Sequence, residues 1–156
     1  MNLTRLKMRY RKELLVLRRS LSPELRSYCS SALCERLLAI VEAHEHSRLF
    51  AYAPIKGEPD LLPLASRLPE GRFLLPFTHL EQSRLSFHTW SPGQELVINR
   101  YGIAEPLPTA AQEVRNTDII AVPALAFSMQ GFRLGYGGGF YDRLLSQSSG
   151  ISIGIA

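Results

Sequence analysis

Residues 119–145 read IIAVPALAFSMQGFRLGYGGGFYDRLL, and this stretch decides the fold class. Its first part, Ile119–Phe127, is an apolar run, which predicts a strand buried on both faces and the exit from that strand. Its last part, Phe140–Leu145, has helix-forming residues and an acid, Asp142, in the first turn. A loop between a buried strand and a helix therefore carries four glycines: Gly135, Gly137, Gly138 and Gly139.

Such a loop suits a phosphate group. Glycine lacks a Cβ, so a ligand can approach the bare backbone closely, and the helix that follows offers unpaired N–H groups. Arg133 and Arg143 flank the glycines with guanidinium groups, which pair well with phosphate. Asp142 supplies a hard oxygen ligand of the kind that magnesium takes in nucleotide sites. The stretch predicts a site for phosphate and a metal ion.

A glycine-rich loop by itself is often only a tight turn. This loop is not a Walker A motif, because no Gly-Lys-Ser/Thr follows it. It is not the dinucleotide-binding fingerprint either, because Phe140 stands where a third glycine is needed. The combination of arginine, aromatic residues, glycines and aspartate within a few residues is what favours a binding site.

Pro123–Phe127 followed by Gly131–Arg143 resembles the signature of the 5-formyltetrahydrofolate cyclo-ligase family. The resemblance implies ATP- and Mg²⁺-dependent cyclisation of 5-formyltetrahydrofolate to 5,10-methenyltetrahydrofolate, with release of ADP and phosphate. It also implies the fold shared with ribose-phosphate isomerases and coenzyme A transferases. Strands that alternate with helices independently predict an α/β protein, a three-layer α/β/α sandwich on a largely parallel sheet.

The resemblance also implies roles for individual residues. Asp142 would be the metal ligand, and Lys7, Arg11 and Arg133 would be catalytic by holding phosphate oxygens. The implied ATP-binding residues are Lys7, Met8, Arg9, Tyr10, Arg11, Arg133, Leu134, Gly135, Tyr136, Gly137, Gly138, Gly139, Phe140 and Tyr141. The implied folate-binding residues are Arg11, Ala53, Glu58, Trp90, Tyr136, Gly137, Gly138, Gly139 and Phe140.

The N-terminal segment concentrates the positive charge. Residues 1–20 carry seven basic residues and one acidic residue, a net +6, whereas the whole chain is +4 and the remainder is therefore −2. Apolar residues at steps of three and four predict an amphipathic helix over 3–20, with Lys7 and Arg11 on one face. Three interpretations of this basic face compete. It is a solvated surface, a surface that binds nucleic acid, or a pair of side chains that hold phosphate. The acidic remainder argues against nucleic acid, and the family resemblance favours phosphate.

Two other residues have an ordinary interpretation beside the functional one. Glu58 lies on a Gly-Glu-Pro turn, where an acid is usually just solvated. Trp90, the only tryptophan, is ordinarily a core or capping residue. In the family, Tyr-x-Pro followed by Glu belongs to the substrate site, which Tyr52, Pro54 and Glu58 match. The resemblance suggests Trp90 as a wall for the pterin ring.

The rest of the chain supports one domain over residues 1–156. Ser22-Pro23-Glu24 predicts a helix start, and the helix continues to about Val41. Short strands are expected at 49–53, 73–76 and 85–90, a short helix at 61–68, and an internal strand at 151–155. Family members run on beyond the position of Ala156 and bring a second acidic residue to the metal. We expect a chain without that segment to bind nucleotide but to lose most turnover.

Composition sets the broad class. With 46% apolar and 21% charged residues in 156, the chain is typical of a globular domain. No run approaches the length of a membrane span and no secretory signal is recognisable, so we expect a cytoplasmic monomer without membrane contact. Cys29 and Cys34 suit buried thiols in a reducing compartment. The rival interpretations are another phosphate-handling enzyme on the same fold and a non-catalytic nucleotide-binding module.

Overall fold

The structure, a computed structural model, describes residues 2–156. Its helices are α1 (Leu3–Ser20), α2 (Pro23–Ala43) and α3 (Phe140–Gln147), with a short 3₁₀ helix, η1, at Leu62–Ser66. The main sheet consists of β1 (Leu49–Phe50), β2 (Phe73–His79), β3 (Arg84–Thr89), β6 (Ile119–Pro123) and β9 (Ile151–Ile155). Two small hairpins pair β4 (Leu96–Ile98) with β5 (Ala104–Pro106), and β7 (Ala126–Phe127) with β8 (Arg133–Leu134).

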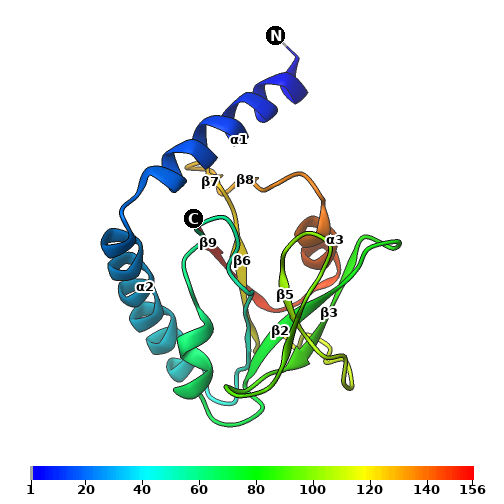
Figure 1. Cartoon of the computed structure of the whole chain (residues 1–156). Coiled ribbons are helices and arrows are strands. Elements are labelled where there is room, and N and C mark those ends of the chain that lie inside the picture. The colour runs from blue at the N-terminus through cyan, green and yellow to red at the C-terminus, as the bar shows by residue number, and fades with distance from the viewer. Residues whose placement is uncertain (1) are drawn as a thin grey trace.

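The main sheet has the strand order β3-β2-β1-β6-β9 (Figure 1). β1 pairs in parallel with β2 and β6, and β6 pairs in parallel with β9. Only β3 runs antiparallel, because a short turn joins it directly to β2. The prediction of a largely parallel sheet is confirmed.

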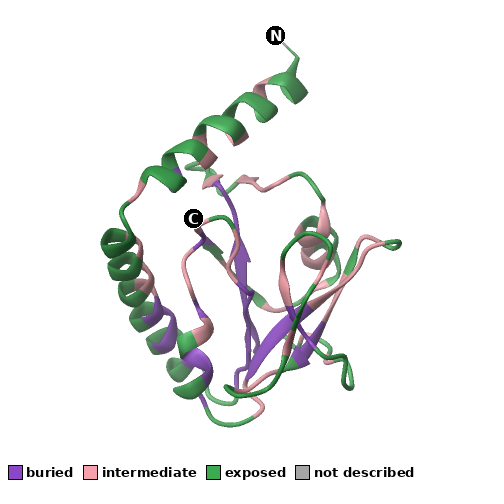
Figure 2. Ribbon diagram, viewed as in Figure 1, coloured by how far each residue is buried: buried purple, intermediate pink, exposed green. Residues whose placement is uncertain are grey.

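The apolar run that begins at Ile119 forms the centre of the sheet. All five residues of β6 are buried (Figure 2). Ile119 and Ala121 belong to the core cluster that α2 covers, whereas Ile120 and Val122 belong to a second cluster against which Leu144 of α3 packs. Side chains alternate between the faces of a strand, so a continuous apolar sequence was required here. The two clusters make a three-layer arrangement, with α2 and α3 on opposite sides of the sheet (Figure 1).

A buried ion pair fixes the start of β6 to the start of β1. The carboxylate of Asp118 is fully buried and accepts hydrogen bonds from Arg48 Nη2 at 2.6 Å and Arg48 Nε at 3.1 Å. It also accepts from the backbone N–H groups of Arg48 at 3.1 Å and Arg115 at 2.7 Å. Burial alone would raise the pKa of Asp118, but these hydrogen bonds and the charge of Arg48 outweigh it and hold that pKa below its ordinary value.

The start of α2 and the position of β9 can be compared with what the sequence predicted. α2 begins as predicted: the Ser22 side chain accepts from the N–H of Leu25, and Pro23 occupies the first turn. β9, whose sequence is apolar enough for an internal strand, forms the outer edge of the sheet as described over residues 2–156. Its residues Ile151 and Ser152 are exposed, and only Ile155 is buried. None of the helices in the described part of the chain is both long and apolar enough to cross a membrane.

Candidate active site

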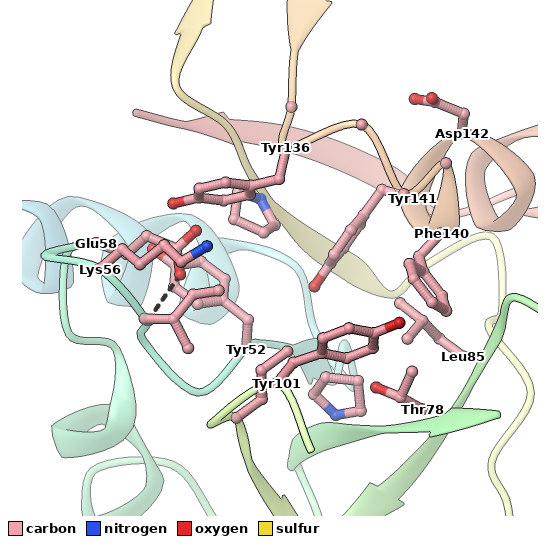
Figure 3. A pocket seen from close by; sticks show the side chains of 18 of the residues that line it. Tyr52, Lys56, Glu58, Thr78, Leu85, Tyr101, Tyr136, Phe140, Tyr141 and Asp142 are labelled. Atoms are coloured by element: carbon pink, nitrogen blue, oxygen red, sulfur yellow. Dashed lines mark hydrogen bonds between the residues drawn. The ribbon is translucent and has the colours of Figure 1, made fainter. Parts of the chain in front are cut away.

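A cavity of about 420 Å³ opens at the carboxyl ends of β1, β2 and β6. This is the edge at which open α/β sheets place their ligands. The loop after β1 contributes one wall, the loop from β8 into α3 contributes another, and α1 reaches it from outside. Figure 3 shows that four tyrosine side chains from separate segments converge on the space: Tyr52, Tyr101, Tyr136 and Tyr141.

The glycine loop has the backbone that its sequence requires. Gly137 and Gly139 have φ values of 103° and 71°, which L side chains rarely adopt, and Gly139 is the N-cap of α3. A Cβ on Gly135 would lie 2.6 Å from Arg133 Nη1, so a side chain at this position would displace the Arg133 guanidinium. The loop leaves a stretch of bare backbone that ends at a helix N-terminus, inside the cavity.

Arg133 is the arginine of the loop that faces the cavity. Its Nη1 donates to the carbonyl oxygen of Pro123 at 3.1 Å, its Nη2 pairs with Asp142, and its guanidinium lies over the ring of Tyr141 at 5.7 Å. Its Nε is buried and has no hydrogen-bond partner. The Asp142 carboxylate is 72% exposed and points away from the aromatic side chains in Figure 3. Arg143 lies outside the lining and donates to Gly138 O at 2.8 Å.

Helix α1 brings two more cations to the cavity, Lys7 and Arg11. They are four residues apart and so share one face of the helix, as predicted. Arg11 Nε donates to the carbonyl oxygen of Gly135 at 2.8 Å, and its guanidinium would touch a Cβ on Gly137. Lys7 is exposed at the cavity mouth. Lys7 and Arg11 therefore join Arg133 in the lining of the cavity, as cationic side chains available to a ligand.

Glu58 is buried in the cavity wall beside Tyr136, with 8% of its surface exposed (Figure 3). Its Oε2 accepts from the N–H of Ile55 at 2.9 Å, which closes a tight turn in which Lys56 and Gly57 both have positive φ. Burial raises the pKa of Glu58, although the Ile55 N–H, the Tyr136 hydroxyl and two nearby cations oppose the rise. Lys56 Nζ lies 5.3 Å from the centre of the Tyr136 ring.

The tyrosines around Glu58 stay protonated. Burial, followed by the negative charge of Glu58, raises the pKa of Tyr52, Tyr136 and Tyr141. The Tyr52 hydroxyl donates to Pro59 O at 3.0 Å, whereas the Tyr141 hydroxyl is buried without a partner. Buried polar groups without partners are rare, so a ligand that supplies an acceptor to Tyr141 would be stabilised.

The β4–β5 hairpin covers the remaining side. Its turn places Tyr101 and Ile103 on the cavity. Glu105 is buried and ties this hairpin to β2: its Oε1 accepts from the Thr78 N–H at 3.0 Å and from Asn99 Nδ2 at 2.8 Å. The carboxylate therefore fixes the hairpin over the sheet.

Comparison with known proteins identifies the family. A family model described as "5-formyltetrahydrofolate cyclo-ligase family" matches residues 4–154. The chain belongs to this family. Two curated relatives carry the name 5-formyltetrahydrofolate cyclo-ligase. That of Mycolicibacterium smegmatis is 37% identical over 68% of this chain, and that of Escherichia coli K12 is 34% identical over 82%.

These matches span 58% and 73% of the two relatives' own lengths. A solved structure of the 5,10-methenyltetrahydrofolate synthetase of Aquifex aeolicus superposes with a TM-score of 0.81 at 35% identity. That match covers 97% of this chain and 77% of the solved one. The structural match confirms the fold class that the sequence predicted.

Most of the residues implied by the cyclo-ligase signature come together in the cavity. From the N-terminal half the lining includes Lys7, Arg11, Ala53 and Glu58; from the C-terminal half it includes every residue from Arg133 to Asp142. Met8, Arg9 and Tyr10 are exposed on α1 and do not line the cavity, because neighbouring helix positions point in different directions. Arg9 pairs instead with Glu13 at 2.7 Å.

The structure does not bring Trp90 to the cavity. Because β3 is antiparallel to β2, the end of β3 lies at the opposite edge of the sheet, beside the first residue of β2. There the Trp90 ring packs against Phe73, with ring centres 6.0 Å apart, and its Nε1 donates to Gln94 O at 3.2 Å. The ordinary interpretation, a residue that packs on the core, describes it.

The structure adds lining residues that sequence reasoning missed: Ile55, Lys56, Pro76, Thr78, Leu85, Tyr101, Ile103 and Pro123. Tyr101 had a usable signal, because it directly precedes Gly102-Ile103-Ala104-Glu105-Pro106, a segment that resembles a turn of the cyclo-ligase family. Thr78 and Leu85 had none, because their access to the cavity depends on the register between β2 and β3.

Proposed function

We propose that this chain catalyses the ATP-dependent cyclisation of 5-formyltetrahydrofolate to 5,10-methenyltetrahydrofolate, with release of ADP and phosphate. One observation carries the proposal. A single cavity joins a cationic, glycine-rich end to an aromatic end that contains a buried carboxyl group. The first end suits a triphosphate and the second a flat heterocycle with polar edges. Membership of the family supports both assignments.

At the phosphate end, Lys7, Arg11 and Arg133 would hold phosphate oxygens, and the backbone of Gly135–Gly139 would add N–H donors. Phosphoryl transfer depends mainly on positioning and on neutralising charge, which is what these groups offer. Arg133 suits the role because its Nε has no partner in the protein. Arg11 is held in place by Gly135 O.

Magnesium would enter with ATP. Asp142 is largely exposed and pairs with Arg133 through one oxygen, Oδ1. No cluster of three or more His, Cys, Asp or Glu side chains that could hold a metal occurs within residues 2–156. Magnesium commonly takes one or two carboxylates and completes its shell with phosphate oxygens and water, so the donor set fits an ion carried by ATP. We assign Asp142 as its protein ligand; the ion would neutralise phosphate charge.

At the other end, Glu58 and Tyr136 would orient the pterin. Glu58 is buried and fixed by the 55–58 turn, so its carboxyl group can meet the polar edge of the ring without reorganising. The aromatic walls exclude water from the reacting groups. Ala53, Phe140 and the glycine backbone would line the space between the two ends.

The chemistry then follows from placing the formyl group between the two ends. A formyl oxygen bound to an amide-like carbon is a poor leaving group. Transfer of the γ-phosphoryl group to that oxygen makes it a good one, and the neighbouring folate nitrogen attacks the carbon as phosphate departs. No covalent bond to the protein is needed, since the two substrates supply all the reacting atoms.

The test is the absorbance of methenyltetrahydrofolate formed from 5-formyltetrahydrofolate, with ATP or Mg²⁺ omitted in turn. We expect product only in the complete mixture. Tight ATP binding without product would favour a non-catalytic nucleotide-binding module. Formation of product without ATP would contradict the proposal.

A further inference from the structure

Arg18 is the only buried residue of α1 as the structure describes that helix. Most of the α1 ribbon is exposed or half-exposed (Figure 2), whereas Arg18 is 8% exposed. A buried guanidinium is costly unless acceptors satisfy it. Within residues 2–156 no carboxylate lies within ion-pair distance of Arg18. The hydrogen bonds of the Arg18 guanidinium must therefore offset the cost of burying its charge.

Those contacts join three segments at the carboxyl edge of the sheet. Arg18 Nη1 donates to the Tyr136 hydroxyl at 3.0 Å, and Nη2 donates to the carbonyl oxygen of Ala124 at 2.6 Å. Its stem packs beneath the 55–58 turn: a Cβ on Gly57 would lie 3.4 Å from Arg18 Cγ. One side chain thus holds the glycine loop, the exit of β6 and the turn that carries Glu58.

These contacts of Arg18 mainly position side chains that are assigned to folate binding. Arg18 fixes the hydroxyl of Tyr136, and Lys56 of the 55–58 turn lies over the face of the Tyr136 ring. The cations of the phosphate end have anchors of their own, because Arg11 donates to Gly135 O and Arg133 donates to Pro123 O. Arg18 itself does not line the cavity.

We propose that Arg18 is a positioning residue that holds Tyr136 and the 55–58 turn together, and so sets the affinity for 5-formyltetrahydrofolate more strongly than the affinity for ATP. The inference rests on the proposed function. Arg18 acts through Tyr136 and Glu58 and touches neither substrate. The guanidinium of Arg18 reaches the Tyr136 hydroxyl and Ala124 O with two separate nitrogen atoms. A lysine has a single amine and could not bond both acceptors with the same geometry.

The variants are Arg18→Met, which removes both hydrogen bonds but keeps an apolar stem, and Arg18→Lys, which keeps the charge. Arg19→Met is the matched control, because it removes the same charge from an exposed neighbour. Dissociation constants for 5-formyltetrahydrofolate and for ATP are measured separately by calorimetry. Amide hydrogen exchange of the 55–58 turn and the 135–139 loop is measured without any ligand.

In Arg18→Met we expect the folate dissociation constant to rise about tenfold or more, the scale of one charge-assisted hydrogen bond. The ATP constant should rise clearly less than the folate constant, because Arg11 and Arg133 are anchored to the backbone independently of Arg18. Exchange should rise in both segments. Arg18→Lys should lie between Arg18→Met and the wild type, and Arg19→Met should match the wild type.

Equal losses of folate and ATP affinity would overturn the proposal in favour of a general structural role, as would unchanged exchange in both segments. If Arg18→Met does not fold, the same measurements are made on Arg18→Lys. We then expect a selective loss of folate affinity that is smaller than the one expected for Arg18→Met. A wild-type protein that binds no 5-formyltetrahydrofolate would refute the proposed function and the affinity claim. The exchange data would then decide independently whether Arg18 holds the two segments.

Discussion

Replacing Asp118 by Asn should cost a large part of the stability of this domain. The Asp118 carboxylate is fully buried and accepts four hydrogen bonds, two from the side chain of Arg48 and two from backbone N–H groups. Asparagine keeps one acceptor oxygen, but its amide group would face donors that now meet Oδ2. It also leaves the buried guanidinium of Arg48 without a countercharge.

Breaking a buried ion pair from one side costs about 3–5 kcal/mol. Domains of this kind have a total unfolding free energy of about 5–15 kcal/mol. We therefore expect Asp118→Asn to lower the melting temperature by roughly 6–20 °C, taking about 2–4 °C per kcal/mol for this chain length. Urea unfolding at pH 7 should show a lower midpoint with an unchanged slope.

Asp142→Asn is the matched control, since Asp142 also pairs with an arginine but its side chain is 72% exposed. Exposed ion pairs contribute about 0–1 kcal/mol, so this variant should unfold almost like the wild type. A loss below about 1 kcal/mol in Asp118→Asn would refute the reasoning. Because the pKa of Asp118 is depressed in the folded state, its contribution is present above the unfolded pKa of about 3.9 and is lost as the pH falls through the folded value.

Three further predictions concern the cavity. Arg133→Met should raise the KM for ATP far more than that for folate, because a charge-assisted phosphate contact is worth about 1.5–3 kcal/mol; equal effects on both would indicate a structural role. Lys7→Ala should raise the KM for ATP with a stability change below about 0.5 kcal/mol, whereas a large drop in melting temperature with normal ATP binding would indicate packing. Glu58→Gln should impair folate binding yet unfold at a higher temperature than the wild type at pH 8. The raised pKa of Glu58 means that its charged form costs stability as the pH rises through the folded value, so this advantage should vanish near pH 4, about the unfolded pKa.

The sequence predicted those parts of the fold that local chemistry controls. Ser22 and Pro23 specify a helix start by hydrogen bonding and by a fixed φ, which need no tertiary information. The unbroken apolar run at Ile119 predicts burial on both faces. The glycines after Arg133 predicted a loop of unusual backbone, and Gly137 and Gly139 have the positive φ values that favour glycine; their role in binding phosphate stays a prediction.

Tertiary geometry accounts for what was wrong or missed. Trp90 follows a strand whose direction depends on a turn, and reversing that direction moves the ring to the other edge of the sheet. Arg18 resembles any other basic residue of an amphipathic helix, because its burial arises from contact with Tyr136, far away in the sequence.

In the proposed reaction the formyl oxygen leaves on phosphate at the cationic end of this cavity. The most direct measurement uses 5-formyltetrahydrofolate labelled with ¹⁸O in the formyl group, with ATP, Mg²⁺ and this chain. Mass spectrometry of the phosphate released should find one ¹⁸O atom for each methenyltetrahydrofolate formed, and both products should fall together in Arg133→Met when ATP is below saturation. Unlabelled phosphate alongside methenyltetrahydrofolate would contradict the account, because the oxygen would then have departed without phosphoryl transfer.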